Sequence, residues 1–166
     1  MARSVGDITL DWAGTTYTAV TWTSGGPDGL ANATTSGLSD EIDLSAQDNV
    51  EDVLVALEFD KNAAGSAAGF LRILAAAPGI TSGPTKNYPA NPLNWLQVGP
   101  AIIDELNTND QWSNSFSLRM AFGGVLPPFV KLAVENQSGQ TLAGTSGQAV
   151  ENRVWIMFVY RNVKLS

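Results

Sequence analysis

The sequence predicts an all-β protein, an antiparallel β-sandwich that is jelly-roll-like, with about eight strands, long loops and at most one short helix. Short runs rich in β-branched and aromatic residues recur along the chain, and several alternate between apolar and polar positions as strands do. The 16 glycines and 8 prolines that separate these runs indicate many turns and few long helices. The chain has no cysteine, which disfavours an immunoglobulin sandwich with its Cys-Trp-Cys hallmark.

Length and composition indicate one folded domain. With 166 residues, 44% of them hydrophobic and 15% charged, the chain can bury a sizeable core without disulfides. We expect residues 15–166 to form a single β-sandwich domain and residues 1–14 to form an N-terminal arm or a first strand. The N-terminus lacks the apolar core of a signal peptide, and no stretch approaches the ~20 apolar residues of a membrane helix. These features predict a protein kept or assembled in a cytoplasm, with no membrane partner.

The first forty residues predict two strands and a loop. Ile8, Leu10 and Trp12 alternate with polar residues, which is typical of a first strand or an extended arm. The Thr-rich, aromatic residues 15–23 suit a half-exposed strand, and the small polar residues 30–39 are interpreted as a loop.

The middle of the chain contains the first strand with a clear core face. Residues 50–60 alternate, and their predicted core face consists of Val53, Val55, Leu57 and Phe59. A shorter strand is expected at residues 40–44. Residues 70–77 fit either a helical stripe or a strand, and the glycine-rich turn before them, with Pro78 and Gly79 after them, favours a strand.

The following segment mixes loops with weaker elements. Prolines interrupt residues 78–92, which are interpreted as a loop. A short strand that carries Trp95 is predicted at residues 93–98, and a short helix with proline at its first position is predicted at residues 100–106. Two stronger strands, in which apolar and polar residues alternate, are predicted at residues 114–122 and 129–135.

Residues 153–161 are expected to form the central strand of the fold. One face of this strand would carry Val154, Ile156, Phe158 and Tyr160, and the other would carry Trp155, Met157 and Val159. A sheet with one solvated face alternates apolar and polar residues, whereas both faces of this strand are apolar. A second layer of this chain, or another chain, must therefore cover the second face.

The charge distribution disfavours nucleic acid as a partner. The net charge is −7, and residues 1–110 hold 14 acidic and 4 basic residues while residues 111–166 hold 2 and 5. Nucleic-acid binding requires clustered Lys and Arg side chains, which this sequence lacks. The asymmetry is interpreted either as a solvated acidic face or as charge complementarity between neighbouring copies or toward a basic partner.

The residue types available disfavour catalysis. The chain has no histidine and no cysteine, which removes the commonest general base, the usual transition-metal ligand and the thiolate nucleophile. Glu58 with Asp104 or Glu105 is a formal pair of hydrolytic carboxylates, yet every acidic protein of this size offers such a pair. Phosphate-binding glycine loops and the Gly-x-Ser-x-Gly elbow are absent from the sequence. We therefore expect no enzymatic activity, no catalytic residue and no cofactor.

One dense group of acidic residues has two interpretations. Carboxylate oxygens at short spacing are ligands that calcium prefers, although this spacing does not fit an EF-hand loop. The other interpretation is a solvated acidic edge, which discourages edge-to-edge pairing of sheets. We favour the acidic edge and expect no metal site; the residues concerned are Asp40, Glu41, Asp43, Asp48, Glu51 and Asp52.

Five tryptophans are many for a chain of this length. Trp12 and Trp155 are interpreted as structural, whereas Trp22, Trp95 and Trp112 lie near predicted loops or strand ends, where they could stack on sugar rings. Tryptophan is enriched both in cores and at interface hot spots. Burial in the core or in a subunit interface is therefore the favoured interpretation for all five.

The chain as a whole resembles the virion proteins of tailed bacteriophages, most closely their capsid decoration, or cement, proteins. The resemblance is carried by residues 50–59, by residues 88–92 (YPANP), and by residues 127–135 followed by 152–162, in a small acidic β-protein without cysteine or histidine. Some proteins of this kind are jelly rolls that trimerise over the capsid lattice. The resemblance implies a non-enzymatic structural protein of the virion, assembled in the host cytoplasm. Its partners would be the major capsid protein and copies of itself, most simply as a trimer.

Two functional hypotheses follow from these patterns. In the first, a capsid-bound oligomer makes contacts through the N-terminal arm, the loop at residues 78–92 and the second face of the central strand, with the candidate interface residues Ile8, Leu10, Tyr88, Trp95, Trp112, Trp155, Met157 and Val159. In the alternative, the chain is a carbohydrate-binding jelly-roll module with Trp95, Trp112 and Tyr88 as stacking platforms. A glycan binder should expose aromatic side chains in a groove, whereas a cement protein should hide them between chains.

Overall fold

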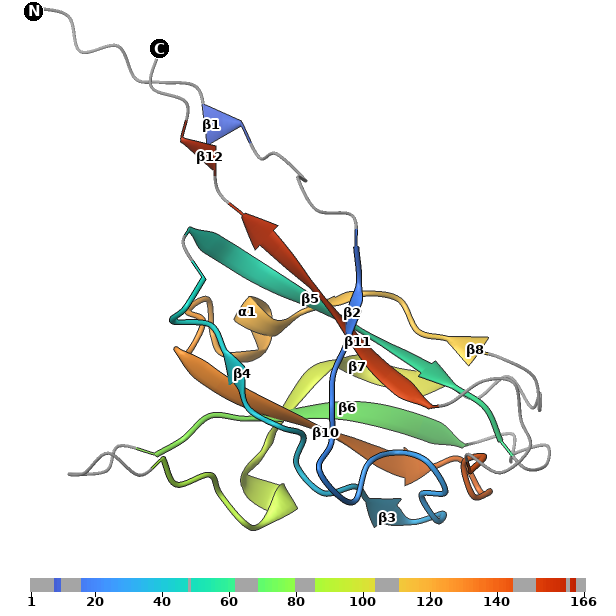
Figure 1. Cartoon of the computed structure of the whole chain (residues 1–166). Coiled ribbons are helices and arrows are strands. Elements are labelled where there is room, and N and C mark those ends of the chain that lie inside the picture. Colours follow the sequence, from blue (N-terminus) through green and yellow to red (C-terminus); the bar gives the residue numbers. More distant parts are fainter. Residues whose placement is uncertain are drawn as a thin grey trace, which may run out of the picture.

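The computed structural model describes residues 8–9, 16–47, 49–61, 69–79, 86–103, 111–144, 152–160 and 162–163. Two antiparallel sheets pack face to face, with one short helix at an edge (Figure 1). The first sheet contains β2 (Thr18–Ala19), β11 (Arg153–Tyr160), β5 (Val50–Phe59), β8 (Gln111–Trp112) and β9 (Phe116–Ser117). The second contains β3 (Thr34–Thr35), β4 (Ile42–Asp43), β10 (Phe129–Gln137), β6 (Phe70–Ala76) and β7 (Leu96–Ile103). The remaining elements are β1 (Ile8–Thr9), β12 (Asn162–Val163), the 3₁₀ helix η1 (Pro92–Asn94) and α1 (Leu118–Ala121).

The strand order, which the sequence does not give, is that of a jelly roll and agrees with the predicted architecture. The first sheet runs β2-β11-β5, with β8 and β9 both paired to the far side of β5, and the second runs β3-β10-β6-β7, with β4 also on β10. Strands that follow one another in the chain therefore occupy matching positions in the two sheets: β2 with β3 and β4, β11 with β10, β5 with β6, and β8 and β9 with β7. The last two long strands therefore lie inside the sheets: β11 lies between β2 and β5, and β10 lies between β3 and β6. The closing strands of a jelly roll take these positions in its two Greek keys.

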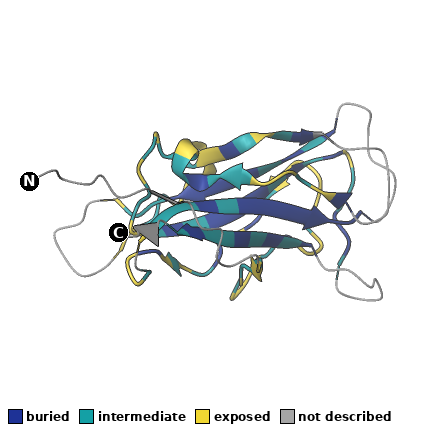
Figure 2. Cartoon of the chain, turned by 90° about the horizontal axis from the view of Figure 1, so that it is seen from above, coloured by how far each residue is buried: buried dark blue, intermediate teal, exposed yellow. Residues whose placement is uncertain are grey.

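The core lies between the long strands of the two sheets. The predicted core face of β5 is confirmed, because Val53, Val55, Leu57 and Phe59 are all fully buried. Opposing residues of the second sheet are buried to the same extent, among them Leu71, Ile73, Leu132 and Val134. Buried positions run along the long strands in Figure 2. The ambiguous segment at residues 70–77 is a strand, since β6 pairs along its length with β10.

The predicted helix at residues 100–106 is wrong where the structure describes it, because residues 100–103 belong to β7. The Gly99-Pro100 signal marks an irregularity in a strand: β7 pairs Val98 with Ile73 and Ile102 with Leu71, so its register shifts over the residues between. Gly99 has φ = +73°, and a Cβ there would lie 2.3 Å from Cγ of Phe116. Glycine is required by the backbone conformation and by the close approach of β9, not by a helix start.

The predicted strand at residues 114–122 is also wrong beyond Ser117. Only Phe116–Ser117 pairs with β5, and the chain then forms the single turn of α1. Ser117 ends the strand because its Oγ accepts a hydrogen bond from the backbone N–H of Met120 at 3.0 Å, as an N-cap does. Leu118 is fully buried and anchors the turn in the core. The apolar alternation is real, but it does not describe a strand.

Smaller differences concern the weak elements. Only Thr18–Ala19 of the predicted strand 15–23 pairs, and the predicted loop 30–39 contains β3. Residues 92–94 form η1 ahead of β7, so Trp95 precedes the strand rather than lying in it. The predicted first strand appears as β1, which pairs with β12 beyond the end of β11 (Figure 1). No helix in the described parts of the chain is both long and apolar enough to cross a membrane.

Candidate functional site

The second face of β11 lies on the outside of the first sheet. β11 is the predicted central strand, paired with β5 on one side and with β2 on the other. Val154 and Ile156 point into the core, while Trp155 and Met157 are half-buried on the opposite face. Directly opposite residues of antiparallel strands share a face, so Met157 lies beside Leu54 of β5. An apolar strip therefore crosses the outer side of two neighbouring strands.

Trp112 extends this strip to the edge of the sheet. Its side chain is 58% exposed, and its ring stacks on that of Trp155 with centroids 6.1 Å apart and an interplanar angle of 25°. We call the surface formed by Leu54, Trp112, Trp155 and Met157 the tryptophan face. Val159, a further residue of this side, is only 9% exposed, so the chain itself already covers part of the second face of β11.

The polar group of Trp155 is satisfied within the chain. Its indole Nε1 donates to Oε2 of Glu58 at 2.7 Å, and Glu58 is 8% exposed beneath the stacked rings. Arg153 stands opposite Glu58 in the β11–β5 register, with its guanidinium carbon 5.7 Å from the centroid of the Trp155 ring. What Trp155 offers to the exterior is therefore apolar ring surface, without an indole N–H that needs a partner.

A hydrogen bond ties the two sides of the tryptophan face together. The hydroxyl groups of Tyr17 and Ser115 are 2.6 Å apart. Tyr17 precedes β2 and Ser115 precedes β9, and β11 and β5 lie between those two strands in the sheet. The face is therefore held by contacts across its width, which limits the conformational entropy lost when a partner binds.

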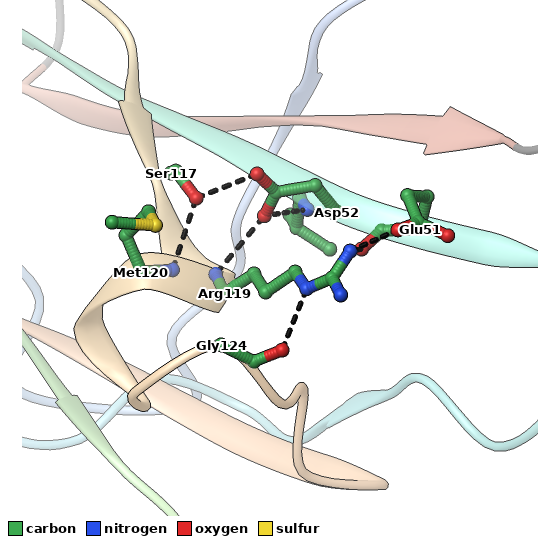
Figure 3. Close-up of polar contacts among 7 residues, drawn as sticks. Glu51, Asp52, Ser117, Arg119, Met120 and Gly124 are labelled. Atoms are coloured by element: carbon green, nitrogen blue, oxygen red, sulfur yellow. Dashed lines mark hydrogen bonds and ion pairs between the residues drawn. The ribbon is translucent and has the colours of Figure 1, made fainter. Parts of the chain in front are cut away.

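The helix α1 is fastened to β5 beside this face, as Figure 3 shows. Asp52 accepts hydrogen bonds from Ser117 Oγ at 2.6 Å, from the Arg119 backbone N–H at 3.0 Å and from the Val53 backbone N–H at 2.7 Å. Arg119 forms an ion pair with Glu51 and donates from Nε to the carbonyl oxygen of Gly124 at 2.6 Å. Glu51 and Asp52, at the start of β5, are thus both engaged within the chain.

The other described members of the acidic group are also held separately. Asp40 accepts from the Thr23 hydroxyl at 2.6 Å, which lowers the pKa of its carboxyl, and Asp43 accepts from the Ser45 hydroxyl at 2.7 Å with the same effect. Within the described residues, no three acidic side chains converge to hold a metal ion. Asp48 lies outside the described residues.

Tyr88 serves to fasten a loop. Its hydroxyl donates to Oε2 of Glu41 at 2.7 Å, and Lys86 Nζ lies 2.5 Å from Oε1 of the same carboxylate. The bond from Lys86 lowers the pKa of Glu41, while burial and the adjacent carboxylate raise the pKa of Tyr88. Lys131 Nζ also lies 5.1 Å from the centroid of the Tyr88 ring. These contacts occupy the ring that the glycan hypothesis uses as a platform.

The three predicted stacking platforms do not form one surface. Trp112 lies opposite Glu58 in the first sheet, whereas Trp95 precedes β7 in the second sheet, where Leu96 lies opposite Ala75. Trp95 Nε1 donates to the carbonyl oxygen of Pro89 at 2.6 Å, which places it beside the Tyr88 segment but not beside Trp112. A single groove lined by all three rings is therefore absent.

The remaining predicted site residues divide between described and undescribed parts of the chain. Ile8 belongs to β1, while Leu10, Asp104 and Glu105 lie outside the described residues, as do residues 80–85 of the predicted contact loop. Sequence reasoning missed Leu54, which is not part of the predicted core face of residues 50–60, and it missed Arg72, which lines a groove on the second sheet. The sequence signal for an exposed apolar surface at Leu54 is a large apolar residue between Asp52 and Ala56, on the face opposite the predicted core.

Comparisons of the chain with protein-family models, with curated protein sequences and with solved structures find no match.

Proposed function

We propose that this chain is a non-enzymatic structural protein that associates with copies of itself through the tryptophan face. The observation that carries the proposal is the largely exposed ring of Trp112, stacked on Trp155 beside Met157 and Leu54. Aromatic side chains and methionine are enriched at the cores of protein interfaces, and tryptophan is prominent among hot-spot residues.

The electrostatics of the face support burial against a protein. A chain with a net charge of −7 repels its own copies in general, so association needs a surface where charge is absent or balanced. On the tryptophan face, Glu58 is buried under the rings and Arg153 stands opposite it in register. Leu54 and Met157 are apolar, and the indole N–H of Trp155 is bonded to Glu58, so two copies can bury this surface without desolvating an unpaired charge.

We further propose that this oligomer belongs to a bacteriophage virion. The resemblance of the sequence to capsid decoration proteins supports a trimer bound to the major capsid protein of a bacteriophage, and the jelly-roll strand order is compatible with it. In that setting the oligomer would bridge neighbouring capsid subunits and oppose rupture of the lattice, since linked contacts gain from their high effective concentration.

The test of self-association is the solution mass by light scattering over a dilution series. We expect a closed oligomer for the unaltered chain, and for Trp112→Ala a shift of the dissociation midpoint to at least about tenfold higher concentration. Leu93→Ala is the matched control, because Leu93 is 90% exposed on the other side of the molecule. A monomer at every concentration, or an oligomer that Trp112→Ala leaves unchanged, would overturn the proposed seam.

The lattice contact is tested separately by co-sedimentation with capsid shells that lack decoration. We expect saturable binding of the unaltered chain, at a whole-number ratio to the symmetry axes of the shell. Shells that sediment without the chain at saturating concentration would refute the virion assignment while leaving self-association intact.

A further inference from the structure

A second surface feature lies on the outside of the other sheet. A groove of about 300 Å³ runs beside η1 and the start of β7. That volume is at the small end of the range of about 300–1,000 Å³ that ligand sites occupy. The lining residues that matter here are Arg72 and Leu74 of β6, Glu135 of β10, Leu93 of η1, Trp95 between η1 and β7, and Gln97 of β7.

The polar side of the groove is the ion pair of Arg72 with Glu135. Arg72 Nη1 lies 3.1 Å from Glu135 Oε2, and the two side chains are partly exposed. Arg72 Nε is buried, and the guanidinium carbon lies 4.4 Å from the centroid of the Phe70 ring. A ligand in the groove would therefore meet the terminal nitrogens of Arg72 and the carboxylate oxygens of Glu135.

The apolar side of the groove is built and held in place. Leu74 is nearly buried at its floor, and the exposed side chain of Leu93 stands at its rim. The Trp95 ring is fixed by the bond from its Nε1 to Pro89, while Asn91 Oδ1 accepts from the Leu93 backbone N–H at 3.0 Å and caps η1. The ring and the rim therefore lose little freedom when a ligand binds.

We propose that this groove binds one neutral pyranose ring of a glycan. A sugar ring presents an apolar C–H face, which suits Trp95 and Leu74, and an edge of hydroxyl groups that both donate and accept. Arg72 supplies donors and Glu135 supplies acceptor oxygens. The exposed Gln97 donates from Nε2 to the carbonyl oxygen of Gly99 at 2.8 Å, and adds its amide oxygen and its second N–H. Polar groups of this sort orient a ligand in an otherwise apolar site.

The charges select a neutral sugar over an acidic ligand. Arg72 is already compensated by Glu135, so an incoming carboxylate or phosphate would meet a neutral pair on a chain whose net charge is −7. An anion would gain little attraction and would approach the Glu135 carboxylate at close range. Sugar hydroxyl groups, in contrast, can hydrogen-bond to Arg72 and Glu135 without adding a charge to this ion pair.

The test is a titration followed by amide NMR shifts, with glucose, galactose, mannose and N-acetylglucosamine as neutral probes and glucuronate as the acidic probe. We expect at least one neutral sugar to shift amides of β6, β7 and β10 saturably, and glucuronate to bind at least about tenfold more weakly. Trp95→Ala should weaken binding by at least about tenfold, and Gln97→Ala should weaken it without affecting folding, because Gln97 is exposed.

Val125→Ala is the control, since Val125 is exposed and belongs neither to the groove nor to the tryptophan face, and it should leave the titration unchanged. Absence of saturable shifts with all four neutral sugars would overturn the proposal, as would tighter binding of glucuronate or binding that both groove variants leave intact. The groove and the tryptophan face lie on opposite sides of the sandwich, so failure of either inference leaves the other standing.

Discussion

The two outer faces of this sandwich differ in how they treat their polar groups. On the tryptophan face, the indole N–H of Trp155 is bonded to buried Glu58, and the exterior shows rings and apolar side chains. On the groove face, Arg72 and Glu135 remain partly exposed. A surface of rings and apolar side chains is suited to a protein neighbour, whereas a hollow lined by exposed donors and acceptors is suited to a small polar ligand. One jelly roll thus presents two surfaces of different chemistry.

The largest expected effect comes from the core that both faces share. Leu132 is fully buried between the sheets, and Leu132→Ala should lower the free energy of unfolding by about 2–5 kcal/mol. Urea denaturation measures the change. Val125→Ala, at a residue that is 73% exposed, is the control and should change stability by less than about 0.5 kcal/mol. Equal effects of the two substitutions would contradict the packing of one sheet on the other.

The next largest effect concerns the hydrogen bonds that join α1 to β5, in the sheet that carries the tryptophan face. Asp52→Ala removes the acceptor of Ser117 Oγ and of the Arg119 backbone N–H, and should destabilise the chain by about 1–3 kcal/mol. Ser117→Ala removes only the cap and should cost about 1 kcal/mol. The two substitutions in one chain should be less damaging than the sum of both, because they share a contact. Strict additivity in urea unfolding would argue against the network in Figure 3.

A smaller effect distinguishes the hydrogen bond that holds the Trp155 side chain from the ring surface that this side chain exposes. Glu58→Ala leaves the indole N–H of Trp155 without an acceptor, and should cost about 1–2 kcal/mol of unfolding free energy. Glu58→Gln keeps an acceptor and should cost less, with self-association retained in light scattering. If the glutamine variant dissociated as readily as Trp112→Ala, the carboxylate itself would belong to the interface.

The smallest effect is a pH dependence that is confined to the groove side. Glu41 holds Lys86 and Tyr88, and the next residue, Pro89, accepts the hydrogen bond of Trp95. Because the pKa of Glu41 is lowered in the folded chain, its contribution is complete above the ordinary glutamate pKa of about 4.3 and is lost as the pH falls through the lowered value.

Glu41→Gln should therefore be less stable than the unaltered chain at pH 6 by under about 1 kcal/mol, and the gap should close toward pH 3. Urea unfolding at both pH values measures it. A gap that widens on acidification would reverse the sign of the linkage. Sugar binding should weaken slightly at pH 3, whereas self-association through the tryptophan face should not follow this carboxylate.

Parts of this fold could be predicted from local pattern because burial imposes a period of two on a strand. The alternation of Val53, Val55 and Leu57 predicts a core face, and the two apolar sides of β11 predict a central strand; the structure confirms both. The number of strands and the long connections between them predict a jelly-roll architecture, whereas the order of the strands comes from the structure.

Other parts could not be predicted because the deciding partner is distant in sequence. Ser117 ends a strand because Asp52, 65 residues away, and the Met120 backbone N–H both bond to its hydroxyl. Gly99 marks a register shift because Phe116 approaches it from the other sheet. The local alternation of apolar and polar residues is the same whether a strand continues, ends or shifts its register. It therefore predicts neither the end of the strand at Ser117 nor the register shift at Gly99.

The same division holds for the candidate sites. The sequence by itself determined that Trp155 and Met157 share an outward face, since side-chain direction along one strand is fixed by its backbone. Only the tertiary structure decided that Trp112 stacks on Trp155, that Leu54 lies beside Met157, and that Arg72 and Trp95 line one groove. Those neighbours are set by the register between strands and by the order of the sheets, and register is the outcome of packing over the whole core rather than a property of any one segment.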